Sequence, residues 1–240
     1  MTVTSRFERK YHLSPGAYVR VRNIVRGRMR PDSYTVASGG RYLVRSLYYD
    51  TRDFEAFHER NNGDFGRIKL RIRVYTDAAT EVETARVELK TKRGNSMEKY
   101  GAFVPYAECR RFIQEGTWPD HSDPVLAEFE RLIRVRALRP VLVVQYHREG
   151  FCTRDGSPVR LALDHNVHSA RATEIFPQRV LLKPHRPKNI VLEIKAESRH
   201  EPEWMRDIVR RHSLKQVSNS KYVQGIEIVR PLMATPRVIS

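Results

Sequence analysis

Residues 69–75 read KLRIRVY, and this stretch decides how the chain folds. Its odd-numbered positions carry cations and its even-numbered positions aliphatic side chains: Lys69, Arg71 and Arg73 against Leu70, Ile72 and Val74. In a β-strand, side chains two residues apart point to the same face. The stretch therefore predicts a strand with three cations on one face and three aliphatic side chains packed on the other.

The same alternation recurs in four further segments, RVELKTK (86–92), IVLEIKAE (190–197), VRLALDH (159–165) and FERKYH (7–12). The charged residues that share a face in these segments are Glu88, Lys90 and Lys92; Glu193, Lys195 and Glu197; Arg160 and Asp164; and Glu8, Lys10 and His12. In each segment the opposite face is largely apolar. Several strands of one sheet are thus expected to turn a charged face the same way.

Two interpretations of that face are open. An antiparallel sheet with one solvated face alternates in this manner, and its charges then have no special role. Like charges on neighbouring strands repel each other, however, and the aligned positions are mostly Arg and Lys. A multivalent anion would relieve this repulsion. If the sheet curls with these faces inward, it forms a basic tunnel lined by Arg71, Arg73, Glu88, Lys90, Arg160, Glu193 and Lys195.

The remaining patterns predict an α+β protein or a decorated barrel. We expect strands at 5–12, 42–50, 66–76, 84–92, 99–106, 140–150, 158–165, 190–197 and 224–229. We expect helices at 15–28, near 52–59, after Asp123-Pro124 and after Glu201-Pro202, where a capping residue or proline precedes an amphipathic run. There is no internal repeat and no Gly/Ser linker, so residues 1–240 are predicted to form a single domain.

The composition restricts the class of binding partner but does not identify one. The 240 residues include 44 Lys and Arg against 28 Asp and Glu, a formal net charge of +16. Such an excess favours a polyanion, which leaves nucleic acid, anionic membrane and polyphosphate open. Two cysteines without metal-ligand spacing favour a reducing compartment. The absence of a signal core and of a long apolar run favours a cytoplasmic location.

A phosphate chain suits a basic tunnel, because Arg and Lys bind non-bridging phosphate oxygens and Arg does so bidentately. An isolated carboxylate among such cations is a poor phosphate ligand but a good anchor for Mg²⁺ or Mn²⁺, which prefer oxygen ligands. Glu193, in the middle of its strand beside Lys195, is the candidate.

The segments also resemble a known family. In order along the chain they are FERKY (7–11), SLYYDT (46–51), KLRIRVY (69–75), VELKTK (87–92), VQYHREGF (144–151), VRLALDHNV (159–167), VLEIKAE (191–197) and SNSKYVQGI (218–226). Together they resemble the VTC (vacuolar transporter chaperone) catalytic domain of the triphosphate tunnel metalloenzymes, from about residue 6 to 229. The resemblance implies an antiparallel eight-stranded β-barrel that forms a tunnel, with flanking helices.

The resemblance also implies roles for individual residues. Phosphate-contacting catalytic residues would be Arg71, Arg73, Lys90, Arg148, Arg160 and Lys221, with Lys10, Lys69, Lys99 and Lys195 as further phosphate-binding residues. Glu193 and Glu8 would hold the metal. Hydrolytic members of the wider superfamily open with Glu-x-Glu-x-Lys, whereas here Arg6 stands in place of the first Glu. This departure disfavours a phosphohydrolase or cyclase.

We therefore expect a metal-dependent, ATP-dependent polyphosphate polymerase, which passes the γ-phosphate of ATP to a growing inorganic polyphosphate chain. The sequence has no Walker-type loop and no kinase signature, so side chains would have to hold the phosphates of ATP. A non-catalytic polyphosphate-binding module and a tripolyphosphatase are the alternatives. Without a recognition helix or RNA-binding signature, no specific nucleic-acid partner is expected. A membrane-protein partner encoded elsewhere stays possible.

Overall fold

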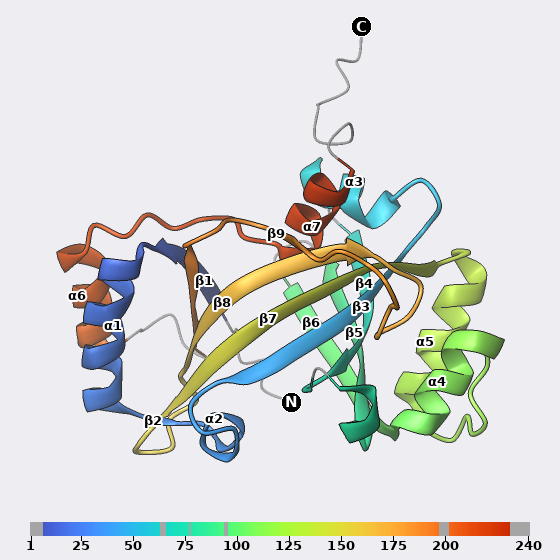
Figure 1. Ribbon diagram of the computed structural model, residues 1–240, viewed down its shortest axis with the longest axis horizontal. Helices are drawn as coiled ribbons and strands as arrows, with labels where there is room; N and C mark the ends of the chain where they lie inside the picture. Colours follow the sequence, from blue (N-terminus) through green and yellow to red (C-terminus); the bar gives the residue numbers. More distant parts are fainter. Residues whose placement is uncertain (1–6, 63–65, 77, 94–95, 197–201, 231–240) are drawn as a thin grey trace, which may run out of the picture. The chain divides into compact units, whose positions relative to one another are not determined.

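The computed structural model describes residues 7–62, 66–76, 78–93, 96–196 and 202–230 (Figure 1). Arg6, Glu197 and the side chain of Lys92, which entered the sequence analysis, lie outside what is described.

In the described part of the chain, ten strands form the sheet. They are β1 (Phe7–Leu13), β2 (Met29–Pro31), β3 (Tyr42–Asp50), β4 (Gly66–Val74), β5 (Thr84–Arg93), β6 (Ser96–Pro105), β7 (Arg139–Thr153), β8 (Arg160–Arg171), β9 (Lys183–Pro184) and β10 (Ile190–Ala196). The helices are α1 (Pro15–Arg28), α2 (Ser33–Ala37), α3 (Glu55–Asn61), α4 (Tyr106–Glu115), α5 (Pro124–Val135), α6 (Glu203–Arg211) and α7 (Lys221–Val229), with a 3₁₀ turn at Ala79–Glu81.

The strands pair in the order β1-β10-β8-β7-β3-β4-β5-β6, with β2 on β7 and β9 on β8. This antiparallel sheet with flanking helices confirms the α+β class. Within the described residues, the path ends at β1 and β6 without a pairing between them, so the expected eight-stranded closed barrel is a ten-stranded open sheet. The term barrel applies only loosely, and the inward orientation of the charged side chains toward a tunnel stays a prediction.

The chain divides into two compact units. The first contains the described parts of Met1–Leu43, Tyr146–Val167 and Arg186–Ser220, and the second those of Val44–Gln145, His168–His185 and Lys221–Ser240. The prediction of a single domain is not tested by this division and stays a prediction.

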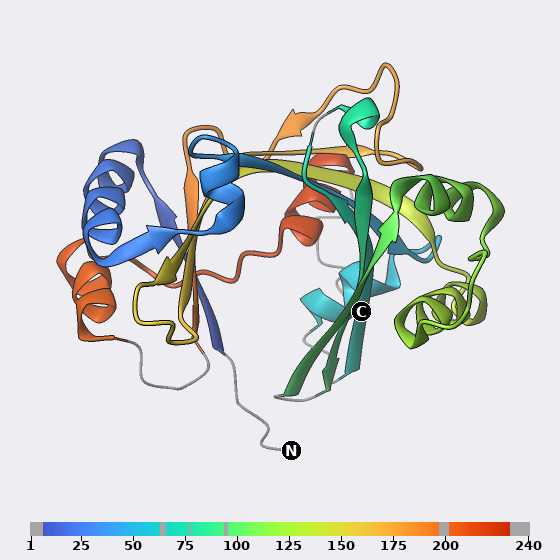
Figure 2. The same ribbon diagram turned by 90° about the horizontal axis from the view of Figure 1, so that it is seen from below.

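In the first unit, the apolar faces of β1, β8 and β10 are covered by α1 and α6, which lie side by side (Figures 1 and 2). The core residues include Leu13, Leu163 and Leu192 from the strands, and they are fully buried. Ser14 begins α1 as the sequence predicts, because its side-chain oxygen accepts a hydrogen bond from the backbone N–H of Ala17.

In the second unit, α4 and α5 cover the apolar faces of β4, β5 and β6. Leu70, Ile72 and Val74 of the KLRIRVY stretch all belong to this core. The alternation is therefore as predicted, because the aliphatic side chains of each strand pack in the core and the charged side chains lie on the other face. Asp123 caps α5, accepting a hydrogen bond from the backbone N–H of Val125 at 2.7 Å.

The prediction of a strand at 224–229 is wrong, because these residues belong to helix α7. Its buried residues, Tyr222, Val223, Gly225 and Ile226, recur at helical spacing. The β-branched residues of this short segment imitate a strand, and tertiary packing overrides that local preference. The sequence analysis also missed α2, α4 and the short strands β2 and β9.

Across the described part of the chain, no helix combines the length and the apolar character that crossing a membrane requires.

Gly225 provides a test of how α7 packs. A Cβ at this position would lie 2.6 Å from Leu142 Cδ2 and 2.7 Å from Ser169 Oγ. We expect Gly225→Ala to lower the free energy of unfolding by about 1–3 kcal/mol through overpacking. Gly27→Ala is the control, because Gly27 lies in α1 with nothing within 4 Å of a built Cβ. This control should gain roughly 0.5–1 kcal/mol in a urea titration. Equal gains at both positions would contradict the packing of α7.

Candidate functional site

The second unit gathers four cations around one carboxylate, that of Glu88 on β5. Arg71 Nε donates a hydrogen bond to Glu88 Oε2 at 2.6 Å, and Arg73 Nη1 lies 3.7 Å from the same oxygen. Lys99 Nζ forms an ion pair with Oε1, and Arg86 Nε lies 3.6 Å from that oxygen. Strand register creates this cluster, because Arg71 of β4 stands directly opposite Glu88.

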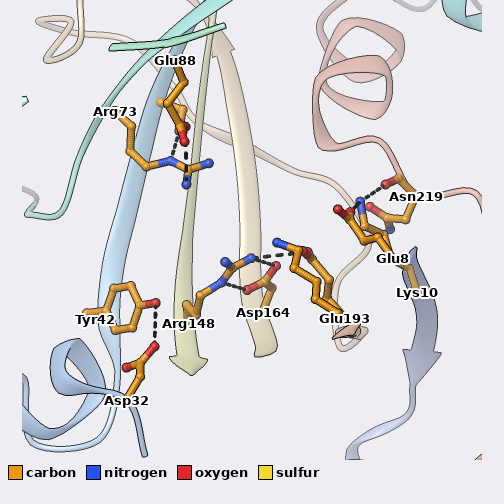
Figure 3. A network of polar contacts seen from close by, with 12 residues as sticks. Glu8, Lys10, Asp32, Tyr42, Arg73, Glu88, Arg148, Asp164, Glu193 and Asn219 are labelled. Carbon is orange, nitrogen blue, oxygen red and sulfur yellow. Dashed lines mark hydrogen bonds and ion pairs between the residues drawn. The ribbon is translucent and has the colours of Figure 1, made fainter. Parts of the chain in front are cut away.

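Glu88 is 1% exposed, so its charge is stabilised by these cations and not by water. Burial by itself raises the pKa of the Glu88 carboxyl, but Arg71, Arg73 and Lys99 outweigh it and hold the pKa far below the ordinary value. Arg73 is also buried, and its Nε donates to Ser46 Oγ at 3.2 Å. Figure 3 shows Arg73 and Glu88 pointing toward each other. One carboxylate against four cations leaves this cluster positively charged.

A row of lysines crosses the strands next to this cluster. Lys69 of β4 stands opposite Lys90 of β5, which stands opposite Lys99 of β6. Like charges directly opposite each other in a sheet are destabilising. Burial and the nearby Arg71 and Arg73 lower the pKa of Lys99 to about 8, although Glu88 opposes this shift. An anion bound on this face would relieve the repulsion.

The first unit contains a second cluster, centred on Arg148 of β7. Arg148 donates to Asp164 through Nε at 2.6 Å and Nη2 at 2.9 Å, and Nη2 lies 3.4 Å from Glu193 Oε2 (Figure 3). Glu193 also forms an ion pair with Lys195. Desolvation lowers the pKa of Arg148, but the carboxylate of Asp164 outweighs it and raises the pKa well above the ordinary value. Arg148 is therefore a permanent cation held in a fixed orientation.

Strand register places the other candidates of the first unit. Lys10 of β1 stands opposite Glu193, and Glu8 stands opposite Lys195. Lys10 Nζ lies 2.7 Å from Glu8 Oε1 and donates to the backbone carbonyl of Asn219 at 2.9 Å. Arg160 stands opposite Lys195 at the start of β8, where it is exposed.

The predicted residues thus fall into two sets. The second unit holds Arg71, Arg73, Lys90, Lys99, Lys69 and, as the first residue of α7, Lys221. The first unit holds Arg148, Arg160, Lys10, Lys195, Glu193 and Glu8. The members of each set that belong to strands share one face of those strands, as the alternation predicts, whereas Lys221 belongs to a helix. The assignment of catalytic and binding roles stays a prediction.

The carboxylates fit one kind of metal site. Within the described residues, no group of three or more His, Cys, Asp or Glu side chains could enclose an ion. Glu193 and Glu8 offer oxygen ligands on neighbouring strands. Mg²⁺ is commonly held by one or two carboxylates together with substrate phosphates and water, so this donor set suits an ion that arrives with a phosphate ligand. It does not suit a metal held by protein alone.

Sequence reasoning missed several contributing residues. It placed Asp164 on the charged face of its strand but gave no role to this side chain, which orients Arg148. Arg86 lies two residues before Glu88 and therefore shares its face of β5, so the alternation could have identified it. His165 is buried in β8, with Nε2 2.8 Å from Glu149 Oε1. Glu149 points away from Arg148 because adjacent strand residues face opposite sides.

Two solved structures share this fold. A candidate adenylate cyclase from Bacillus halodurans aligns with 92% of this chain and 97% of its own, with a TM-score of 0.56 and 16% identity. A candidate adenylyl cyclase from Hippeastrum, described as having a dominant triphosphatase activity, aligns with 93% and 97%, with a TM-score of 0.54 and 13% identity. At these identities the likeness shows the fold alone. The family model described as the VTC domain matches residues 5–230.

Glu88→Gln tests whether the carboxylate stabilises its four cations. Because the folded pKa of Glu88 is depressed, its stabilisation is present above the ordinary value of 4.5 and is lost as pH falls toward the folded value. We expect the variant to lose about 3 kcal/mol of unfolding free energy at pH 7. The difference from wild type should shrink below pH 4.5. Urea titrations across pH measure both.

Glu98→Gln is the matched control, because Glu98 is exposed on the neighbouring strand β6. This variant should change stability by less than about 0.5 kcal/mol. A loss for Glu88→Gln that is the same at pH 7 and at acid pH would contradict the electrostatic role.

Proposed function

The chain belongs to the VTC domain family, and from this premise we propose that it is a metal-dependent polyphosphate polymerase that uses ATP. The observation that carries the proposal is the excess of cations on one face of β4, β5 and β6. Arg71, Arg73, Arg86 and Lys99 share the single carboxylate of Glu88, and Lys69 and Lys90 add further charge. A chain of phosphates, with a negative charge at every unit, is the ligand that best compensates such a face.

The reaction needs positioning and charge stabilisation more than a protein nucleophile. An oxygen of the terminal phosphate of the chain would attack the γ-phosphorus of ATP. A new P–O bond forms, the bond from the γ-phosphorus to the bridging oxygen breaks, and ADP leaves with that oxygen. Arg71 and Arg73 would neutralise the charge that develops on the transferred group, in a site where burial strengthens such contacts.

The cluster of the first unit would bind phosphate and metal. Arg148 is fixed by Asp164 and can meet phosphate oxygens with an orientation set in advance. Mg²⁺ or Mn²⁺ held by Glu193 and Glu8 would supply charge neutralisation at phosphate oxygens when bound. Lys195 and Lys10 would hold the same phosphates from neighbouring strands.

A tripolyphosphatase is the second candidate, because the Hippeastrum protein of the same fold is described as having a dominant triphosphatase activity. Arg6, whose presence in place of a carboxylate disfavours hydrolysis, lies outside the described residues. A third candidate, a binding module without turnover, would need the same cations.

One assay separates the three candidates. Purified protein is incubated with γ-labelled ATP and Mn²⁺ or Mg²⁺, and the products are separated by chain length. A polymerase gives long labelled polyphosphate with ADP in equal amounts to the phosphate transferred. A tripolyphosphatase, given tripolyphosphate in a parallel reaction, gives phosphate and pyrophosphate without longer polyphosphate, and a binding module gives no product in either reaction.

Competition at fixed salt tests the choice of polyanion. Tripolyphosphate should displace a labelled polyphosphate probe at lower concentration than duplex DNA with the same number of charges, because a thin chain can reach cations that are recessed between strands. Fixed salt is needed, since every polyanion binds more tightly at low ionic strength. Equal displacement by DNA would favour a nucleic-acid partner and contradict the proposal.

Glu193→Gln and Arg71→Ala test the division between metal and phosphate ligands. Removing the carboxylate charge of Glu193 should lower metal-dependent turnover by about 100-fold or more, because the metal loses its anchor. Binding of tripolyphosphate without metal should persist or strengthen. Arg71→Ala should instead weaken phosphate binding by about 1.5–3 kcal/mol, with or without metal.

The control for the charge change is Glu203→Gln, an exposed glutamate in the first turn of α6. It should leave turnover and affinity unchanged. Full metal-dependent synthesis by Glu193→Gln would show that Glu193 is not the metal ligand. Titration calorimetry with and without Mn²⁺, together with the labelled-ATP assay, measures these effects.

A further inference from the structure

Two tyrosine rings that pack against each other at a tilt lie beside the cations of β4, and neither has a role in the function proposed above. Tyr48 belongs to β3 and Tyr222 to α7, and both lie in the second unit. Their ring centroids are 5.3 Å apart with an interplanar angle of 34°. Both are buried, at 7% and 2% exposure. Tyr48 shares the face of Arg71, because these two residues stand opposite each other in the register of β3 and β4.

Each ring supports one cation. Arg71 Nη1 donates a hydrogen bond to the Tyr48 hydroxyl at 3.0 Å, and its guanidinium carbon lies 5.8 Å from the centroid of the Tyr48 ring. Lys69 Nζ lies 5.3 Å from the centroid of the Tyr222 ring. Both distances are within the range of cation–π attraction.

Asp50 at the end of β3 holds the pair in place. Its carboxylate, which is fully buried, accepts hydrogen bonds from the backbone N–H groups of Thr51, Ala56 and Phe57 at 2.7, 2.9 and 3.3 Å. The same carboxylate accepts a hydrogen bond from the Tyr222 hydroxyl. The position of Tyr222 is thereby tied to the start of α3, and that of Tyr48 to Tyr222 through the contact between their rings.

We propose that Tyr48 and Tyr222 are positioning residues, an uncharged support that orients Arg71 and Lys69 for a phosphate ligand without neutralising them. The inference rests on the proposed function for the identity of that ligand. Glu88 also orients Arg71, but a carboxylate cancels part of the charge that a phosphate would bind. An aromatic ring attracts a cation through its quadrupole and leaves the net charge of the cation unchanged.

The electrostatics of Tyr48 agree with this role. Burial raises the pKa of its hydroxyl, yet Arg71, Arg73 and Lys221 outweigh burial and lower the pKa below the ordinary value of 10.0. The hydroxyl thus lies in a strongly positive field while it accepts the hydrogen bond of Arg71. A neutral oxygen acceptor in that field orders the guanidinium and keeps the region attractive to anions.

Tyr48→Phe removes only the hydroxyl that accepts the hydrogen bond from Arg71 Nη1. The Kd for tripolyphosphate, measured by titration calorimetry without metal, should rise about tenfold, because a hydrogen bond to a charged group is lost. Tyr49→Phe is the matched control. Tyr49 is the next residue of β3 and is equally buried, but its ring packs on Phe129 on the core face of the strand. Tyr49→Phe should leave the Kd unchanged.

Tyr222 gives an independent test with a conservative rescue. Tyr222→Leu removes the ring under Lys69 and should raise the Kd about fivefold. Tyr222→Phe keeps the ring and loses only the bond to Asp50. It should therefore lower the Tm but keep a Kd close to that of wild type. Equal Kd values for the Leu and Phe variants would overturn the role of the ring.

A ligand-free measurement separates this inference from the proposed function. In the ¹H–¹⁵N spectrum of the unliganded protein, the Arg71 Nη–H resonances should shift and broaden in Tyr48→Phe, because Nη1 is the donor to Tyr48, and stay in place in Tyr49→Phe. Wild-type protein that fails to bind tripolyphosphate would overturn the proposed function but not the positioning of Arg71. An unchanged Arg71 resonance in folded Tyr48→Phe, or an unchanged Kd where wild type binds, would overturn the positioning.

Discussion

The alternation of strand side chains is the constraint on which the rest of this structure depends. Each aliphatic residue of KLRIRVY that enters the core forces its neighbour to the opposite face. Leu70, Ile72 and Val74 thus place Lys69, Arg71 and Arg73 together, and β5 does the same with Glu88 and Lys90. The burial that stabilises the fold therefore also assembles the charged face. A one-residue slip in register would exchange the two faces and destroy both.

An assembled face of cations is unstable unless something compensates it, and the molecule uses three devices. Glu88 and Asp164 neutralise part of the charge through ion pairs with Arg71 and Arg148. Backbone acceptors hold other cations, as the carbonyl of Asn219 holds Lys10. Aromatic rings support Arg71 and Lys69 without changing their charge. The positive charge that these devices do not compensate attracts a polyanion. This attraction connects the folding of the sheet to its proposed chemistry.

The carboxylates of the charged face differ in their contacts. Glu88 pairs with Arg71 and Arg73, Asp164 pairs with Arg148, and both carboxylates act as internal counterions. Glu193 is bound through one oxygen to Lys195 and lies at the longer distance of 3.4 Å from Arg148. A carboxylate that is less tightly held by arginine is the more available ligand for a divalent ion. In the sequence all three are single acidic residues on the charged face of a strand, and the ion pairs that distinguish Glu88 and Asp164 from Glu193 are known only from the structure.

The local sequence pattern was sufficient to predict the central strands and the capped helices. The alternation in β4, β5 and β10, the serine before α1 and the aspartate before α5 are properties of short segments, and physical chemistry acts on them directly. The sequence by itself thus determined the α+β class, the core face of each main strand and the cations of the charged face. Tertiary structure alone decided that 224–229 is helical, that the sheet is open within the described residues and that the rings of Tyr48 and Tyr222 lie near Arg71 and Lys69. These features depend on contacts between segments far apart in the chain, such as Asp50 with Tyr222, which no local period of side chains encodes.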